Sequence, residues 1–164
     1  MGTYSSTESA ARSAEYARQL TDGLYVKHGI SNFIPSVVKM DMATKCYAAM
    51  EGGKHKVVFG GGLLGLWALE GYRPRIKDAH IWGSVARGWK QVAHVVAIHE
   101  FAHVLVRQSN NGRCPLGSNG NREIHGAAFM AHLRILANLL PMPKYEVGEE
   151  LPEETLRQLE RGEF

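Results

Sequence analysis

The clearest hydrophobic pattern along the chain is helical and covers residues 89–107. Apolar side chains form two stripes in this segment, and Glu100 is the only charged residue between Val92 and Val106. A helix that is apolar on two faces is a central, buried one. We therefore expect residues 89–107 to form the central helix of the fold.

Two further helices are predicted on either side of this one. Residues 6–28 carry Ala and Leu at helical spacing, with serines before them and a glycine after them. The second is expected from Ser118 or Asn121, either of which can cap it, to about Leu140, where prolines follow. A polar loop rich in Gly, Asn and Ser, residues 109–120, joins it to the central helix.

Strands are expected in the first half of the chain. Alternation and turn signals predict them over residues 36–42, 45–50 and 54–59, with a short one at 78–83. Gly52 and Gly53 separate the second and third of these strands and can supply the positive φ that a tight hairpin turn requires. The apolar run 63–69 is compatible with either a helix or a buried extended segment.

These elements predict an α+β fold with an N-terminal helix, a small sheet of three to four strands, the buried central helix and a second helix after it. The 164 residues are long enough to bury one core. We expect a single domain over 1–164, with residues 1–5 and about 145–164 as tails. The apolar content of 45% and charged content of 21% are those of a folded globular protein and exclude a mainly disordered chain.

Charge and cysteine content exclude only a few classes of protein. The net charge of +3 is spread along the chain, which permits contact with nucleic acid but does not argue for it. Cys46 and Cys114 are far apart and form no CxxC pair, so neither a disulfide scaffold nor a cysteine-rich zinc site is indicated. Without a signal-peptide pattern or an apolar run of roughly 18 residues, we expect a soluble cytoplasmic protein that does not engage membranes.

The central helix carries the candidate chemistry, in the sequence His99-Glu100-Phe101-Ala102-His103. Buried imidazoles without partners cost several kcal/mol, and a metal ion removes that cost. Residues four apart share a helix face, so one ion can bind both histidines. Glu100 is offset by about 100° and can border the ion as a general base. This HExxH pattern is typical of zinc metalloproteases.

A catalytic zinc ion takes three protein ligands and leaves the fourth position to water. Glu123, His125 and His132 of the following helix are candidates for the third ligand. Two residues that are two apart on a helix point in nearly opposite directions, so Glu123 and His125 cannot both face the ion. His132 is better explained as a core or surface histidine, or as a partner of a ligand. The spacing alone leaves the choice between Glu123 and His125 open.

His125 begins the segment His125-Gly126-Ala127-Ala128-Phe129. A buried HExxH helix, a polar loop and H-G-x-x-F on the next helix together resemble the SprT-like family of zinc metallopeptidases, which includes the Spartan-type proteases. The resemblance covers roughly residues 79–140. It implies a zincin-like core in which Gly126 lets two helices approach and Phe129 packs one turn below the ligand. The zinc ligands that it implies are His99, His103 and His125, with Glu100 as the general base.

The function that this resemblance implies is zinc-dependent hydrolysis of peptide bonds by a metal-activated water. Protein or peptide substrates follow, and an edge strand near His80 is a candidate for pairing with them. Several family members act on proteins attached to DNA, but this chain lacks the four-cysteine ribbon of the longer members. Two alternatives are a non-hydrolytic zinc-containing binding or regulatory protein, such as a phage-type factor, and a DNA-associated module with a structural metal.

Other residues have weaker claims to a role in the site. Cys114 is a candidate thiolate ligand that would keep the enzyme latent. His94 lies five residues before His99 and is expected to be structural. The candidates for stabilising an oxyanion are Tyr72 and Tyr145, and a basic rim would be formed by Arg73, Arg75, Lys77 and Arg87.

Overall fold

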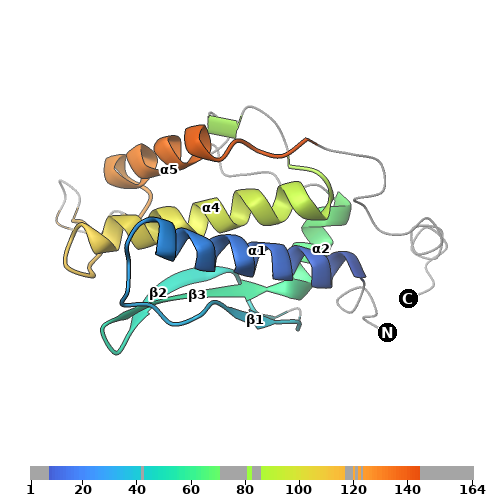
Figure 1. Cartoon of the computed structure of the whole chain (residues 1–164), viewed down its shortest axis with the longest axis horizontal. Coiled ribbons are helices and arrows are strands. Elements are labelled where there is room, and N and C mark those ends of the chain that lie inside the picture. Colours follow the sequence, from blue (N-terminus) through green and yellow to red (C-terminus); the bar gives the residue numbers. More distant parts are fainter. Residues whose placement is uncertain are drawn as a thin grey trace.

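A computed structural model of the chain describes residues 8–41, 43–70, 81–82, 86–116, 120, 122 and 124–144. Within these residues the fold is α+β, with helices that pack on a small three-stranded sheet (Figure 1). The named elements, in chain order, are α1 (Glu8–Lys27), β1 (Val37–Lys39), β2 (Tyr47–Glu51), β3 (Lys54–Gly60), α2 (Gly61–Glu70), α4 (Gly88–Gln108) and α5 (Ala127–Leu139).

Helix α1 follows the sequence pattern closely. Small and apolar side chains on one face, among them Ala10, Ala14 and Ala17, are buried against the rest of the protein. The helix ends in a Schellman motif, in which Gly29 has a φ of 68°. Its N–H donates to the carbonyl of Val26, and the next N–H along the chain, that of Ile30, donates to Tyr25. The predicted first helix and its glycine stop are confirmed.

The sheet has the strand order β1-β3-β2, so β1 and β2 are its two edges. Strand β1 runs parallel to β3, while β2 and β3 form the expected hairpin, with Glu51 opposite Lys54. Gly52 and Gly53 have φ values of 56° and 77°, as the tight turn requires.

Strand β1 is shorter than the expected 36–42 because the chain turns at Asp41. The Asp41 carboxylate accepts hydrogen bonds from the N–H groups of Ala43 and Thr44, at 2.9 and 2.7 Å. A side chain that satisfies the following backbone in this way competes with extended pairing.

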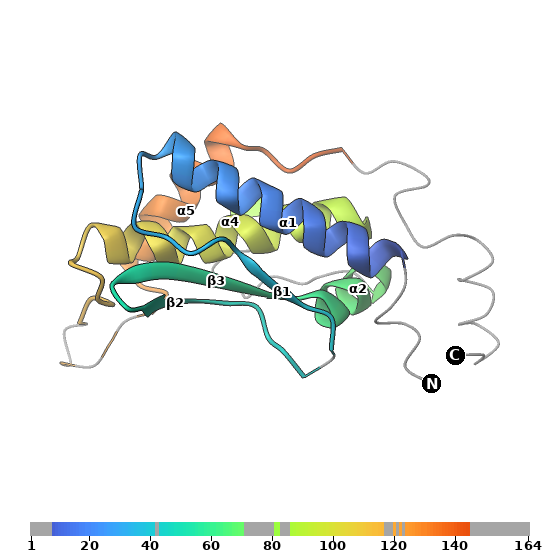
Figure 2. The same ribbon diagram turned by 60° about the horizontal axis from the view of Figure 1, so that its bottom comes forward.

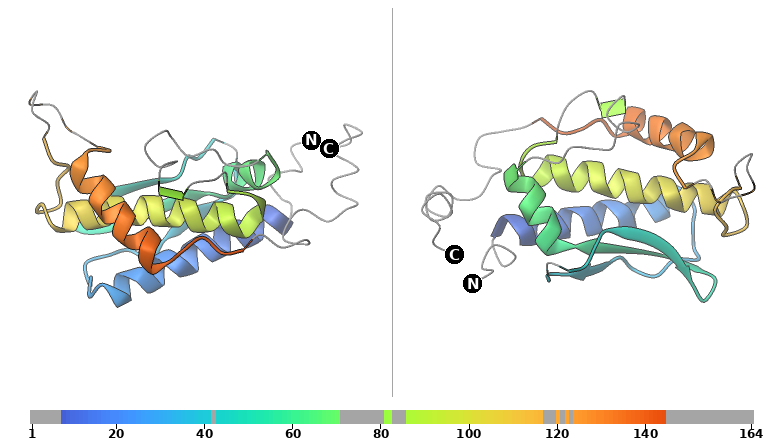
Figure 3. Two further views of the ribbon diagram at one scale, coloured as in Figure 1. Left: turned by 90° about the horizontal axis from the view of Figure 1, so that it is seen from above. Right: turned by 180° about the vertical axis from the view of Figure 1, so that it is seen from behind.

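The layers place α4 in the middle of the molecule. Helices α1 and α4 lie side by side against the sheet, and α5 crosses α4 on the side away from the sheet (Figures 1, 2 and 3). Helix α4 is buried along most of its length, as its two apolar stripes predict. Its first turn is held by Gln91, whose Oε1 accepts the N–H of Arg87 while its Nε2 donates to the carbonyl of Pro143.

Two details differ from the sequence expectation or complete it. The run 63–69, left open above, is part of helix α2. In the expected strand 78–83, Ile81 and Trp82 are instead helical, while the remaining positions lie outside the described residues. Trp82 packs edge-on against His94 of α4, at a centroid distance of 6.0 Å. The strand prediction failed here because the sequence pattern of a short apolar run does not distinguish a helix from a strand.

The expected start of the last helix at residue 118 or 121 is wrong. Gly120 has a left-handed φ of 80°, and Leu116 and Arg122 form an antiparallel bridge that closes the loop. Gly126 is extended, so α5 begins only at Ala127. None of the described helices is long and apolar enough to cross a membrane.

Candidate metal centre

Helix α4 carries the first part of the candidate site at the middle of its length. Glu100 and His103 are buried, with 6% and 9% of their surfaces exposed, and His99 is half-buried. The rings of His99 and His103 lie edge to face one helical turn apart, with centroids 5.1 Å from each other. Helical spacing therefore brings these two imidazoles together, as expected from their separation of four residues.

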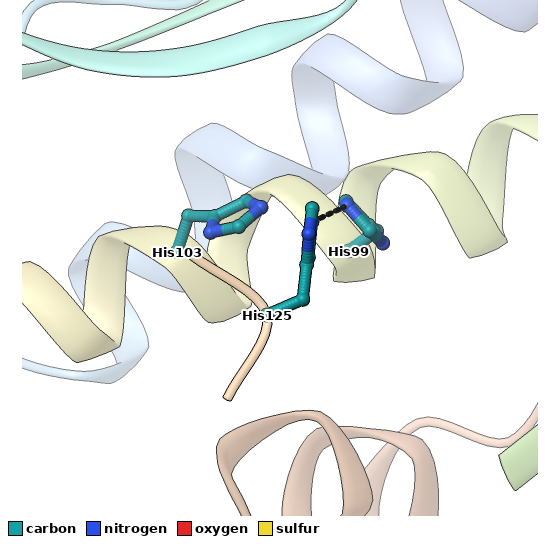
Figure 4. Close-up of side chains that lie close together, drawn as sticks. All are labelled: His99, His103 and His125. Atoms are coloured by element: carbon teal, nitrogen blue, oxygen red, sulfur yellow. Dashed lines mark hydrogen bonds between the residues drawn. The ribbon is translucent and has the colours of Figure 1, made fainter. Parts of the chain in front are cut away.

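His125 joins them from the turn that precedes α5 (Figure 4). Its ring centroid lies 5.1 Å from that of His99 and 4.8 Å from that of His103. One ligand atom from each of the three histidines lies within 4.8 Å of the other two. Because His125 precedes the helix, the argument that Glu123 and His125 oppose each other on a helix does not apply. Glu123 itself lies outside the described residues.

The ring of Phe129 packs against all three imidazoles. Its ring is 1% exposed, and its centroid lies 4.9 Å from His99, 4.4 Å from His103 and 4.8 Å from His125. The carbonyl of Gly126 accepts the N–H of Met130 in the first turn of α5, so the segment that carries His125 runs directly into the helix that carries Phe129. The packing of Phe129 below the histidines agrees with the expectation from the HGxxF segment.

The three-histidine group suits a divalent transition metal. The Nε2 atoms of His99 and His125 are 3.3 Å apart, which permits a hydrogen bond between the rings. Two nitrogens bound to one tetrahedral zinc ion at 2.0–2.1 Å would be separated by about the same distance, roughly 3.3 Å. Neutral imidazole is a favoured ligand of zinc and its neighbours in the transition series. The donor set and the spacing of this pair therefore fit such an ion.

Glu100 leaves α4 about 100° around the helix axis from His99. Helix α4 packs against β2, and the negative charge of Glu100 contributes to the environment of Cys46, just before that strand. Burial raises the pKa of the Cys46 thiol to about 12, the N–H of Gly60 opposes this shift through a hydrogen bond of 3.4 Å, and Glu100 adds to it. The charge of Glu100 is therefore felt at Cys46, just before the edge strand β2.

The outer edge of β2 presents main-chain groups along this side. In the antiparallel ladder, Met50 is opposite His55, whose own N–H and carbonyl bond to residues 32 and 34. Pairs in such a ladder alternate between bonded and non-bonded, so the main-chain groups of Met50 and Ala48 point away from β3. The outward carbonyl of Ala48 accepts a hydrogen bond of 3.0 Å from Nη1 of Arg107. Neither this edge nor Arg107 was recognised from the sequence, although Arg107 follows His103 at the same spacing of four residues.

The other sequence candidates do not join the group. His94 bonds instead to Tyr16 and to the carbonyl of Leu140, at 3.2 and 2.7 Å, which agrees with its expected structural role. Burial lowers the pKa of the half-buried His132. Cys114 is half-buried and free, and among the described residues no further His, Cys, Asp or Glu completes the cluster.

Arg87, expected in a basic rim, is the N-cap residue of α4. Several other candidates lie outside the described residues, namely Tyr72, Arg73, Arg75, Lys77, His80 and Tyr145.

Comparison of the chain with protein-family models, curated proteins and solved structures gives no match.

Proposed function

We propose that this protein is a zinc-dependent endopeptidase of the SprT-like type, with a zincin-like core, in which His99, His103 and His125 hold the ion and Glu100 is the general base. The convergence of three imidazoles from α4 and the turn before α5, with a buried carboxylate next to them, carries the proposal. Structural zinc sites are normally closed by four protein ligands, whereas the described residues contribute three here. A site that only bound a partner would also have no need of Glu100.

The protein's own residues supply the acid–base part of the reaction. When bound, zinc polarises the scissile carbonyl and lowers the pKa of a water molecule. Glu100 would take a proton from that water while the water oxygen attacks the carbonyl carbon. The same carboxyl group would then deliver the proton to the leaving nitrogen as the carbon–nitrogen bond breaks. The burial of Glu100 suits this role, because a carboxylate shielded from bulk water transfers the proton within the site and does not lose it to solvent.

Strand β2 supports the assignment to peptide substrates. The outward main-chain groups of Met50 and the N–H of Ala48 can bond to an extended backbone laid along the edge. Helix α4, which carries Glu100 and two of the three histidines, packs against β2, so a peptide paired with this edge would lie near that helix. Such pairing recognises the main chain before any side chain, as an endopeptidase requires.

The test combines metal analysis with substitution of the base. We expect purified protein to carry one zinc ion per chain and to cleave casein in a chelator-sensitive way. Glu100→Gln should retain the zinc but lose activity by about a thousandfold or more, whereas Glu51→Gln on the exposed end of β2 should retain both. Protein without stoichiometric metal, or a Glu100→Gln variant that cleaves normally, would refute the proposal. Parallel assays on a DNA-bound protein, with and without DNA, test the link to DNA.

A further inference from the structure

Arg107 lies on the same line along α4 as Glu100. It follows Glu100 by seven residues, so the two side chains leave the helix within about 20° of each other and about 10 Å apart along the axis. It also follows His103 by four residues, one turn further along the face that carries the histidines. Because its guanidinium donates to the carbonyl of Ala48, the Arg107 side chain lies at the edge of β2, about two turns beyond the general base of the proposed reaction along α4.

Within the described residues, the guanidinium of Arg107 uses only part of its set of N–H donors. Its Nη1 donates to the carbonyl of Ala48, which anchors the half-buried side chain against the strand edge. Within the described part of the chain Arg107 forms no salt bridge, and the nearby Glu51 is engaged by Lys56 at 3.3 Å. An arginine presents five N–H donors in a planar fork that matches a carboxylate.

The surroundings of Arg107 are also cationic. A Cβ on Gly112, in the turn after α4, would lie 3.5 Å from Cε of Met50, so this turn packs on the far end of β2. The next residue, Arg113, is exposed. Glu51 is neutralised by its own partner, so this end of the edge strand presents positive charge.

From this geometry we infer, on the basis of the proposed function, that Arg107 selects substrates with an Asp or Glu side chain about three residues from the cleaved bond. An extended peptide advances about 3.3 Å per residue, so the rise of about 10 Å along the axis of α4 from Glu100 to Arg107 corresponds to about three residues of a peptide that runs along the helix. The anchoring bond to Ala48 holds the fork at that position. A carboxylate from the substrate then supplies the counter-charge that the described residues do not provide.

A pair of extended peptides that differ only in Glu or Gln at this position tests the inference. A peptide library that varies each position in turn is cleaved first. It identifies the cleaved bond and the substrate position at which an acidic side chain is preferred. We expect the wild-type protein to prefer the Glu peptide by about tenfold in kcat/KM, and Arg107→Met to abolish that preference. Arg107→Glu should shift the preference to Lys, whereas Arg134→Met, on the exposed face of α5, should leave it unchanged.

Binding provides a second readout that does not depend on turnover. In a Glu100→Gln background, fluorescence anisotropy of the labelled peptides should show the same preference and its loss with Arg107→Met. Urea unfolding of each variant reports any destabilisation from loss of the bond to Ala48. Cleavage without an acidic preference, or a preference that survives Arg107→Met, would overturn the role of Arg107 alone. Failure of the zinc-loaded wild type to cleave any library member would overturn the proposed function and this inference with it.

Discussion

Phe129 provides the most direct test of how the candidate metal centre is organised. Its buried ring contacts all three imidazoles, and we expect this contact to restrict their rotamers. Replacement by Leu keeps most of the volume, so the free energy of unfolding of the metal-free protein should fall by no more than about 1.5 kcal/mol. The change leaves the three ligands in place but removes the flat surface that orders them.

The expected loss of metal affinity follows from that ordering. Fixing a side chain in one rotamer costs about 0.5–1.5 kcal/mol at a binding site. If two imidazoles are released, the ion must order them again at a cost of about 1–3 kcal/mol. Since 1.4 kcal/mol is a factor of ten, Phe129→Leu should bind zinc about 10- to 100-fold more weakly.

Competition between the metal-free protein and a chromophoric chelator measures the affinity directly. Urea unfolding at a fixed free zinc concentration provides a second measure, in which the stabilisation by zinc should be smaller by about 1.4–2.7 kcal/mol. Leu136→Val is the matched control, because Leu136 is buried two turns further along the same face of α5. A Phe129→Leu variant with the zinc affinity of the Leu136→Val control would refute the proposed role of the ring.

Two further predictions concern stability. His94 donates through Nε2 to the carbonyl of Leu140, and burial lowers its pKa, so its contribution is present above the ordinary histidine pKa of about 6.5 and is lost as the pH falls below it. Between pH 7 and 5 the free energy of unfolding of His94→Gln should therefore fall less steeply than that of the wild type, and the two slopes should differ by at most about 1.4 kcal/mol per pH unit. Parallel curves for the variant and the wild type would contradict this. A Cβ at Gly60 would overlap the carbonyl of Thr44, so Gly60→Ala should lower the free energy of unfolding by about 1–3 kcal/mol. Gly23→Ala, in open space on α1, should raise it by about 0.5–1 kcal/mol, and equal thermal shifts of the two variants would refute this reasoning.

The local elements were predictable because short-range rules determine them. The pairing of His99 with His103 follows from the period of a helix, and the hairpin follows from two glycines that tolerate positive φ. The burial of Glu100 follows from the apolar residues around it in the same helix. Each of these features depends on residues within a few positions of one another.

The start of α5 was mispredicted because a competing local structure replaces its first turn. Ser118 and Asn121 are good caps in principle, but the bridge between Leu116 and Arg122 and the left-handed Gly120 occupy the backbone in another way. Cap preference is a weak bias, and tertiary contacts override it.

Sequence by itself thus determined that a buried helix presents two imidazoles and a carboxylate at fixed angles around its axis. Only the tertiary structure decided that His125, rather than a residue inside the next helix, completes the group, and that Arg107 meets the outward carbonyl of Ala48 on the edge of β2. The physical reason is that these contacts join segments far apart along the chain, whose relative positions depend on the packing of whole helices and strands against one core. Helical spacing sets the direction in which a side chain points, but packing decides what that side chain meets.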